Sequence, residues 1–190
     1  YWERVESSRN FANKIWNASR FVLMNLEDFD SATTCGELAL TDRWILSRYA
    51  QTVAGVTANM EKFELGEAAR MLYDFIWGEF CDWYIELVKP RLYNKEGATG
   101  RRTAQYVLAY VLERTMRLLH PFMPFISEEI REHLPHEEGS IVRAAWPKTE
   151  PARIDEAAET QMTAVMETIK AVRNMRAEMN VPLGRKGEVI

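Results

Sequence analysis

Three carboxylates at helical spacing are one group of residues in this sequence that could do chemistry. Asp82 and Glu86 lie four residues apart, and Glu79 lies one turn earlier, so a helix would carry all three on one face. Paired carboxylates can act as general acid and base. No histidine or nucleophile lies near them in the sequence, and the segment is full of aromatic residues. A solvent-facing acidic stripe is therefore the favoured interpretation, and Cys81 is interpreted as a small core residue.

A second possible chemistry is metal binding by two histidines. His133 and His136 lie three residues apart, beside Glu132, Glu137 and Glu138. No cysteine or further histidine supports a ligand set there, so a polar loop after a helix end is favoured over a metal site. The sequence also lacks the dinucleotide-binding, P-loop, nucleophile-elbow and zinc-protease motifs. We expect no catalytic centre, metal or cofactor in this chain.

The first expected helix, residues 4–28, offers a different chemistry on the side away from its core. Its apolar positions fall on one stripe: Phe11, Ile15, Ala18, Val22 and Leu26. The other side carries two rows that mix cations, amides and aromatic rings, the first Arg9, Asn13, Trp16 and Arg20, the second Asn10, Lys14, Asn17 and Phe21. Unpaired RNA bases are bound by this mixture, because rings stack on bases, amides read base edges and cations meet phosphates. The alternative is that Trp16 and Phe21 pack against another helix, and periodicity leaves both interpretations open.

Two further sets of basic residues could follow an RNA backbone. One is Arg101, Arg102, Arg114 and Arg117, and the other is Lys170, Arg173 and Arg176 at three-residue spacing. For each set taken alone, ordinary surface solvation is the favoured interpretation.

The elements that must position these residues are helices nearly throughout. After the first, we expect helices from an N-cap at Thr41 or Asp42 to about Phe63, then over 67–93, 101–120, a short one through Glu128 to Leu134, and 155–180. Gly66 should break or offset the second helix, and Pro90 should kink or end the third near Lys89. Residues 30–40 and 94–100 are expected as loops and 135–153 as irregular, with Ile141-Val142 as a possible extended piece. The fold class is therefore an all-α helical bundle over 1–150, with 151–190 as a final helix and the start of a C-terminal extension.

Composition sets broad limits on function. The chain has 190 residues, 47% of them apolar, enough for one domain or one domain with an appendage. No run approaches 18 uncharged apolar residues, so no membrane span is expected. Two distant cysteines favour free thiols in the cytoplasm. The net charge of −4 gives no global attraction to nucleic acid, so an anionic partner would meet local basic patches. The Tyr1-Trp2-Glu3-Arg4 start suggests a piece of a larger protein.

Four segments together resemble the anticodon-binding domain of the valyl-tRNA synthetases, a branch of the class I aminoacyl-tRNA synthetases. They are RNFANKIWNASRF at 9–21, EFCDWYIELVKP at 79–90, LLHPFMPFISEE at 118–129 and RNMRAEMNVP at 173–182. The His-Pro-Phe-Met-Pro core of the third segment is shared with the isoleucyl, leucyl and methionyl relatives. The first and last segments and the Cys-Asp-Trp-Tyr run point to the valyl branch.

The resemblance implies a helical bundle that grips the anticodon stem and loop of a valine tRNA and positions that tRNA for the catalytic domain of the same polypeptide. Carried onto this sequence, it implies that Phe21 is a stacking platform and that Lys14 contacts a phosphate or base. It places Ile85 and Glu86 near the anticodon bases, where Glu86 could accept a hydrogen bond from an exocyclic amine. The neighbouring Asn10 and Asn17, and Arg9, Asn13 and Arg20 of the first row, remain further candidates.

The sequence departs from the whole family enzyme in ways that limit its activity. The HIGH and KMSKS motifs, the editing domain and the coiled-coil arm of the family are absent, so ATP and Mg would be used only by the parent enzyme. Three alternatives stay open: the equivalent isoleucyl domain, a structural module that binds protein, and an independent enzyme that uses Asp82 and Glu86.

Overall fold

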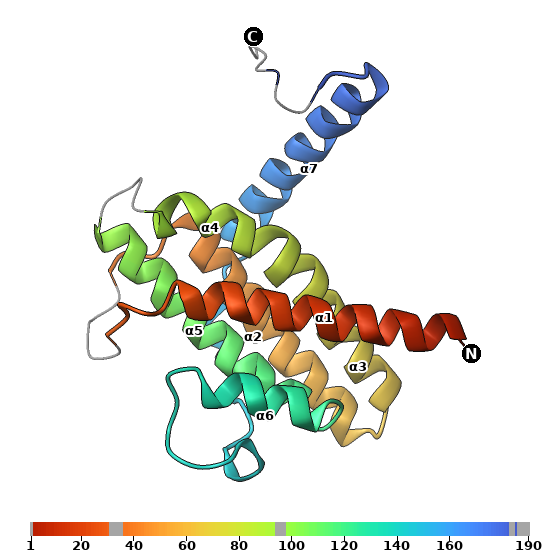
Figure 1. Ribbon diagram of the computed structural model, residues 1–190, viewed down its shortest axis with the longest axis vertical. Helices are drawn as coiled ribbons and strands as arrows, with labels where there is room; N and C mark the ends of the chain where they lie inside the picture. Colours follow the sequence, from red (N-terminus) through yellow and green to blue (C-terminus); the bar gives the residue numbers. More distant parts are fainter. Residues whose placement is uncertain (1, 31–35, 94–97, 183–184, 186–190) are drawn as a thin grey trace.

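The computed structural model describes residues 2–30, 36–93, 98–182 and 185, and within them the chain is all-α, as predicted (Figure 1). No strand occurs in these ranges. The elements follow one another as α1 (Trp2–Met24), α2 (Leu40–Glu61), α3 (Leu65–Asp74), the π-helix η1 (Phe75–Tyr84), α4 (Ile85–Leu92), α5 (Ala98–Leu119), α6 (Pro124–Glu132), the 3₁₀ turns η2 (Ile141–Arg143) and η3 (Pro151–Arg153), and α7 (Glu156–Glu178). None of the described helices is long and apolar enough to cross a membrane.

The faces of α1 are those that the sequence predicts. Phe11, Ile15 and Val22 of the expected stripe are buried in the core, and Ala18 and Leu26 pack against it. Ser19 is also buried, and its hydroxyl donates to the Ile15 carbonyl at 2.9 Å, which satisfies the only polar atom of that side chain. The mixed polar and aromatic rows therefore lie outside the core stripe.

The N-cap of α2 differs from the prediction, because the Asp42 side chain is buried in an ion pair. The N-cap is Ala39, and Asp42 accepts a hydrogen bond from the Ala39 backbone N–H at 3.0 Å. Its carboxylate is fully buried, where Arg91 donates to both oxygens at 2.6 and 2.7 Å and the Tyr84 hydroxyl donates at 2.8 Å. Burial, and then the charge of Asp42, raises the pKa of Tyr84 well above its ordinary value. This buried ion pair ties the start of α2 to η1 and α4.

The expected helix over 67–93 is three elements in succession. The break before it lies at Lys62–Glu64, because Phe63 adopts a left-handed φ of 59° and the Glu64 N–H bonds to the Asn59 carbonyl. Gly66 lies inside the first turn of α3, so the prediction that it breaks the helix is wrong. Residues 75–84 are wound as a π-helix, which periodicity at 3.6 residues per turn does not anticipate.

Pro90 lies inside α4 and does not end it near Lys89, so of the two predicted effects, a kink or an end, the end is wrong. The helix continues to Leu92, and the side chains of Arg91 and Leu92 are buried. The ion pair of Arg91 with Asp42 and the burial of Leu92 hold the last turn in place, so tertiary contacts outweigh the missing N–H of proline.

The remaining connections agree with the prediction in part. Of the loop expected over 30–40, residues 31–35 lie outside the described residues, 36–39 have no regular structure, and Leu40 already belongs to α2. Of the turn expected over 94–100, residues 94–97 lie outside the described residues and α5 begins at Ala98. Ile141-Val142 is a 3₁₀ turn and not an extended piece, since the buried Ile141 directs the chain back against α6.

The last helix, α7, packs against α2 at its beginning and then extends away from the other helices (Figure 1). Its apolar side is accordingly covered only near the base: Met162 is buried and Met166 packs against the core, while Val165, Val172 and Met175 are 40%, 41% and 56% exposed. Arg48 of α2 links the beginning of α7 to η1, because it donates hydrogen bonds to Glu79 of η1 at 2.9 Å and to Glu159 of α7 at 3.4 Å.

Candidate nucleic-acid interface

A groove of about 370 Å³ lies between α1 and the continuous helix made by η1 and α4. Five of the predicted contact residues line it together: Lys14, Asn17, Phe21, Ile85 and Glu86. Its other lining residues are Ala18, Cys81, Asp82 and Lys89. The structure thus brings two segments that are more than 50 residues apart in the sequence into one concave surface.

Helical spacing explains why these side chains meet. On α1 the lining positions Lys14, Asn17 and Phe21 are separated by three and four residues, so they lie on one face. On the opposite wall, Asp82, Glu86 and Lys89 are separated by four and three residues. Each wall of the groove is therefore one face of one helix, and the backbone beneath it is fixed by core packing.

Phe21 is held on its inner side and accessible on its outer side. It is partly buried and packs against the hydrophobic core. The ammonium nitrogen of Lys89 lies 5.6 Å from the centre of its ring, within the range of a cation–π contact. The ring is thus a rigid apolar surface in the groove, which is what a stacking platform requires.

The charges of the groove are balanced. Lys14 pairs with Asp82 and lies 4.4 Å from the centre of the Trp77 ring, and Lys89 pairs with Glu86 at 2.5 Å. Two cations and two carboxylates therefore share the groove. Carboxylates accept hydrogen bonds from amino groups and repel phosphates, so this arrangement suits the edge of a base better than a phosphate.

The floor of the groove is apolar. Ile85 is 6% exposed and Cys81 is 8% exposed. Burial raises the pKa of the Cys81 thiol to about 12, so the thiol stays protonated and behaves as a small apolar group. This confirms the interpretation of Cys81 as a core residue.

The other predicted residues of α1 lie outside this groove. Asn10, from the same row as Lys14, is exposed but does not line it. Arg9, Asn13 and Arg20 are exposed on a neighbouring side of the helix, and Arg9 pairs with Glu6 at 3.2 Å. Trp16 is 39% exposed, so the alternative that both aromatic residues are buried against a helix is wrong for Trp16 and holds in part for Phe21.

Comparison with known proteins identifies the family of the chain. Residues 42–190 match the family described as the anticodon-binding domain of tRNA ligase. The chain belongs to the anticodon-binding domain family of tRNA ligases. The match includes η1, α4 and α7, and so one wall of the groove.

Individual relatives extend the likeness to α1. The chain is 55% identical over its whole length to the valine–tRNA ligase of Carboxydothermus hydrogenoformans, of which it covers 22%. It is 52% identical over 97% of its length to the enzyme of that name from Bacillus thuringiensis and 48% identical over 99% to that of Bacillus subtilis, of which it covers 21% and 22%. The chain thus spans about a fifth of the length of the curated relatives it matches.

The acidic pair of this anticodon-binding domain has structural partners. Asp82 and Glu86 are each paired with a lysine, and Glu79 accepts three hydrogen bonds from Arg48. The three carboxylates are therefore engaged in ion pairs and do not form a free acid–base pair. The hypothesis of an independent enzyme loses its main support.

The histidines do not come together either. His133 Nδ1 bonds to the Glu129 carbonyl at 2.9 Å and His136 Nδ1 bonds to the Leu134 carbonyl at 2.7 Å. Across the part of the chain that the structure describes, no group of three or more His, Cys, Asp and Glu side chains could hold a metal ion.

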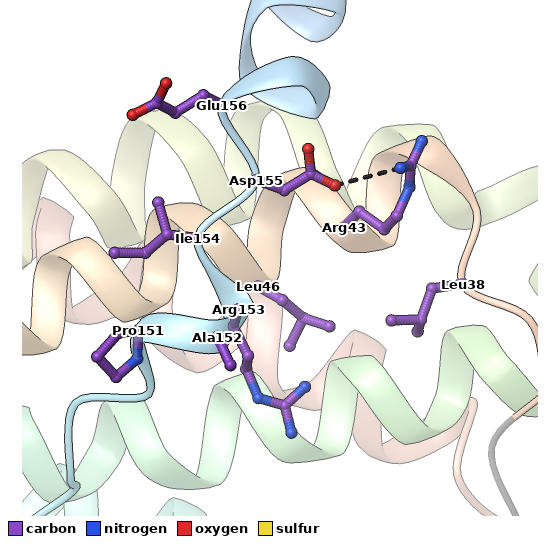
Figure 2. A pocket seen from close by; sticks show the side chains of 9 residues that line it. All are labelled: Leu38, Arg43, Leu46, Pro151, Ala152, Arg153, Ile154, Asp155 and Glu156. Carbon is purple, nitrogen blue, oxygen red and sulfur yellow. Dashed lines mark hydrogen bonds and ion pairs between the residues drawn. The ribbon is translucent and has the colours of Figure 1, made fainter.

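A larger hollow, of about 800 Å³, lies on another part of the anticodon-binding domain (Figure 2). It is formed by Leu38, Arg43 and Leu46 on one side and by residues 151–156 on the other. The ion pair of Arg43 with Asp155, at 3.2 Å, spans it. Neither of the two α1 rows contributes to it, and we assign it to the junction that joins α7 to α2.

Two residues that line the groove, Asp82 and Lys89, are not among the contact residues that the sequence predicts. The sequence places Asp82 on an acidic stripe and gives no role to Lys89. The available signal was the spacing of Asp82, Glu86 and Lys89 at i, i+4 and i+7, which indicates one helix face. Because the resemblance places Glu86 near the anticodon bases, this spacing also predicts Asp82 and Lys89 on the same surface.

Proposed function

We propose that this chain is the anticodon stem-loop recognition module of a valine–tRNA ligase. The observation that carries the proposal is the groove: Lys14, Asn17, Phe21, Ile85 and Glu86 converge on one concave surface. The relatives that match over nearly the whole chain are named valine–tRNA ligases, which supports the valine assignment over the isoleucine one.

In this proposal the groove receives an unstacked base of the anticodon loop. Phe21 stacks on the base, and the Glu86 carboxylate accepts a hydrogen bond from an exocyclic amine. Lys14 meets the base edge or an adjoining phosphate at the rim. Base contacts of this kind discriminate between tRNAs, whereas backbone contacts fix the register. Asn10, Arg9, Asn13 and Arg20, exposed beside the groove, would approach the backbone of the same loop.

The whole protein's role follows from the relatives. We propose that the parent joins valine to its tRNA in a reaction that uses ATP and Mg, and that this chain positions the tRNA for a catalytic domain of the same polypeptide. That role belongs in the cytoplasm, where translation takes place. We take residues 1–150 as the helical bundle and 151–190 as the final helix and the beginning of a C-terminal extension, in keeping with the departure of α7 from the other helices.

The test is a titration of the 190-residue chain against a valine tRNA transcript at two salt concentrations. The control RNAs are the same transcript with its anticodon replaced and an isoleucine tRNA transcript. We expect binding that weakens with salt and drops with the replaced anticodon.

The outcomes separate the candidate functions. Equal binding to the valine transcript and the anticodon replacement would contradict anticodon recognition and leave a backbone-binding surface. Tighter binding of the isoleucine transcript would favour the isoleucyl relative. An absence of binding at low salt would overturn the RNA proposal in favour of a structural module.

A further inference from the structure

The bundle-facing side of α7 changes from apolar to basic along its length. Met162 and Met166 are followed on the same face by Lys170 and Arg173, at spacings of four, four and three residues. Met162 is buried and Met166 packs against the core. Lys170 and Arg173 are exposed. The change therefore follows directly after the part of α7 that packs against the core.

The two cations converge on one aromatic ring. The Lys170 Nζ and the Arg173 Cζ each lie 5.8 Å from the centre of the Trp83 ring, and Trp83 belongs to η1 and is partly buried. These three residues define a basic corner between α7 and η1. Trp83 stands next to Asp82 in the sequence, so the basic corner adjoins the groove across the width of one helix.

Four carboxylates near the basic corner are paired with other cations. Glu79 and Glu159 pair with Arg48, and Asp82 and Glu86 pair with the groove lysines. Among the described residues, no carboxylate forms an ion pair with Lys170 or Arg173. Two unneutralised cations in the angle between two helices attract a polyanion more strongly than the same charges on a convex surface.

We propose that the basic corner binds the phosphate backbone of the RNA whose bases enter the groove. This inference rests on the proposed function, and it assigns contacts with bases and contacts with phosphates to two different surfaces. The groove, with its two carboxylates, accepts base edges. The basic corner, whose cations have no carboxylate partner, accepts phosphates from the strand that leaves the groove, and Trp83 holds both cations in place by cation–π contacts.

The test compares two double variants of the 190-residue chain with equal change of charge. K170Q/R173Q removes the cations of the basic corner. R143Q/K148Q removes two exposed cations, Arg143 at the end of η2 and Lys148 in the segment after it. Affinity for the valine transcript and for its anticodon-replaced version is measured by titration from 0.05 to 0.3 M salt, with thermal unfolding as a check on folding.

The slope of log K against log salt is negative, and we expect K170Q/R173Q to reduce its magnitude by about 1.5, since each phosphate contact contributes about 0.7–0.9. That change corresponds to a loss of affinity of about 30-fold at 0.1 M salt, shrinking to about 10-fold at 0.2 M. The loss should be equal for the two RNAs, because phosphates carry no sequence information. R143Q/K148Q should leave the slope close to that of the unmodified chain.

If K170Q/R173Q keeps the slope and affinity of R143Q/K148Q while anticodon discrimination persists, the inference fails and the proposed function stands. If K170Q/R173Q weakens only the valine transcript, the basic corner reads bases and the backbone assignment is wrong. If the unmodified chain binds neither RNA, both proposals fail together. A purely structural role of the two cations would lower thermal stability without changing the salt slope, and that result also overturns the inference.

Discussion

Replacing Phe21 by leucine isolates the stacking ring from the rest of the groove. Leucine keeps an apolar side chain at a partly buried position that packs against the core, so the free energy of unfolding should fall by only about 1 kcal/mol. The substitution removes the aromatic face and the cation–π contact with Lys89 at 5.6 Å. A base stacked on an aromatic side chain contributes about 1–3 kcal/mol to binding.

That contribution sets the expected loss of affinity. Since 1.4 kcal/mol corresponds to about tenfold in the dissociation constant, F21L should weaken binding of the valine anticodon stem-loop by about 5- to 150-fold. The loss should be smaller for a stem-loop whose anticodon is replaced, because a base that does not fit the groove gains less from the ring. The assay is fluorescence anisotropy with a labelled stem-loop, together with urea unfolding of the variant.

The matched control is the same substitution at a ring outside the groove. Phe125 lies on α6 and is 90% exposed, so F125L makes the same chemical change where no groove residue is touched. If F21L and F125L bind the stem-loop with equal affinity, Phe21 does not stack on RNA. If F21L loses several kcal/mol of stability, the main role of the ring is core packing, and the reasoning about its exposed side is wrong.

Three further changes test other parts of the structure. Arg91→Met should cost about 3–5 kcal/mol in urea unfolding, because it leaves the Asp42 carboxylate buried without its cation; a loss below about 1 kcal/mol would contradict that burial. Phe63→Gly should raise the unfolding free energy by about 1 kcal/mol, since glycine adopts the left-handed φ without strain; an unchanged or lower value would show that the exposed ring compensates. Glu86→Gln should reduce the preference for a base with an exocyclic amine, with a ceiling of about 1–3 kcal/mol; stem-loops differing at one base measure it, and an unchanged preference would remove Glu86 from base recognition.

The sequence predicts the helices and their inner faces well because burial in a bundle repeats every 3.6 residues. Phe11, Ile15 and Val22 are buried as expected. The same arithmetic separates the two outer rows of α1 but cannot choose between them. The choice depends on which helix lies beside α1, and that neighbour is set by tertiary packing rather than by the periodicity of α1 itself.

Two features of the fold depend on partners that are distant in the sequence. Asp42 looks like an N-cap residue, but Arg91 and Tyr84 draw its carboxylate into the core. Pro90 looks like a helix end, but the burial of the residues after it keeps the helix going to Leu92. Local propensity carries no information about either contact, so the predicted N-cap and the predicted helix end are wrong for the same physical reason.

The separation of charge resolves an apparent conflict between composition and proposed function. A net charge of −4 gives the chain no overall attraction to RNA. In the structure, the carboxylates nearest the proposed interface are closed into ion pairs with Lys14, Arg48 and Lys89, whereas Lys170 and Arg173 form no ion pair within the described residues. The field that an approaching strand meets is then basic at the corner of α7 and η1 and neutral in the groove. In the proposed arrangement phosphates bind at the corner and base edges bind in the groove, so an acidic chain would bind RNA locally. Its discrimination between anticodons should then persist at salt concentrations that weaken the overall affinity.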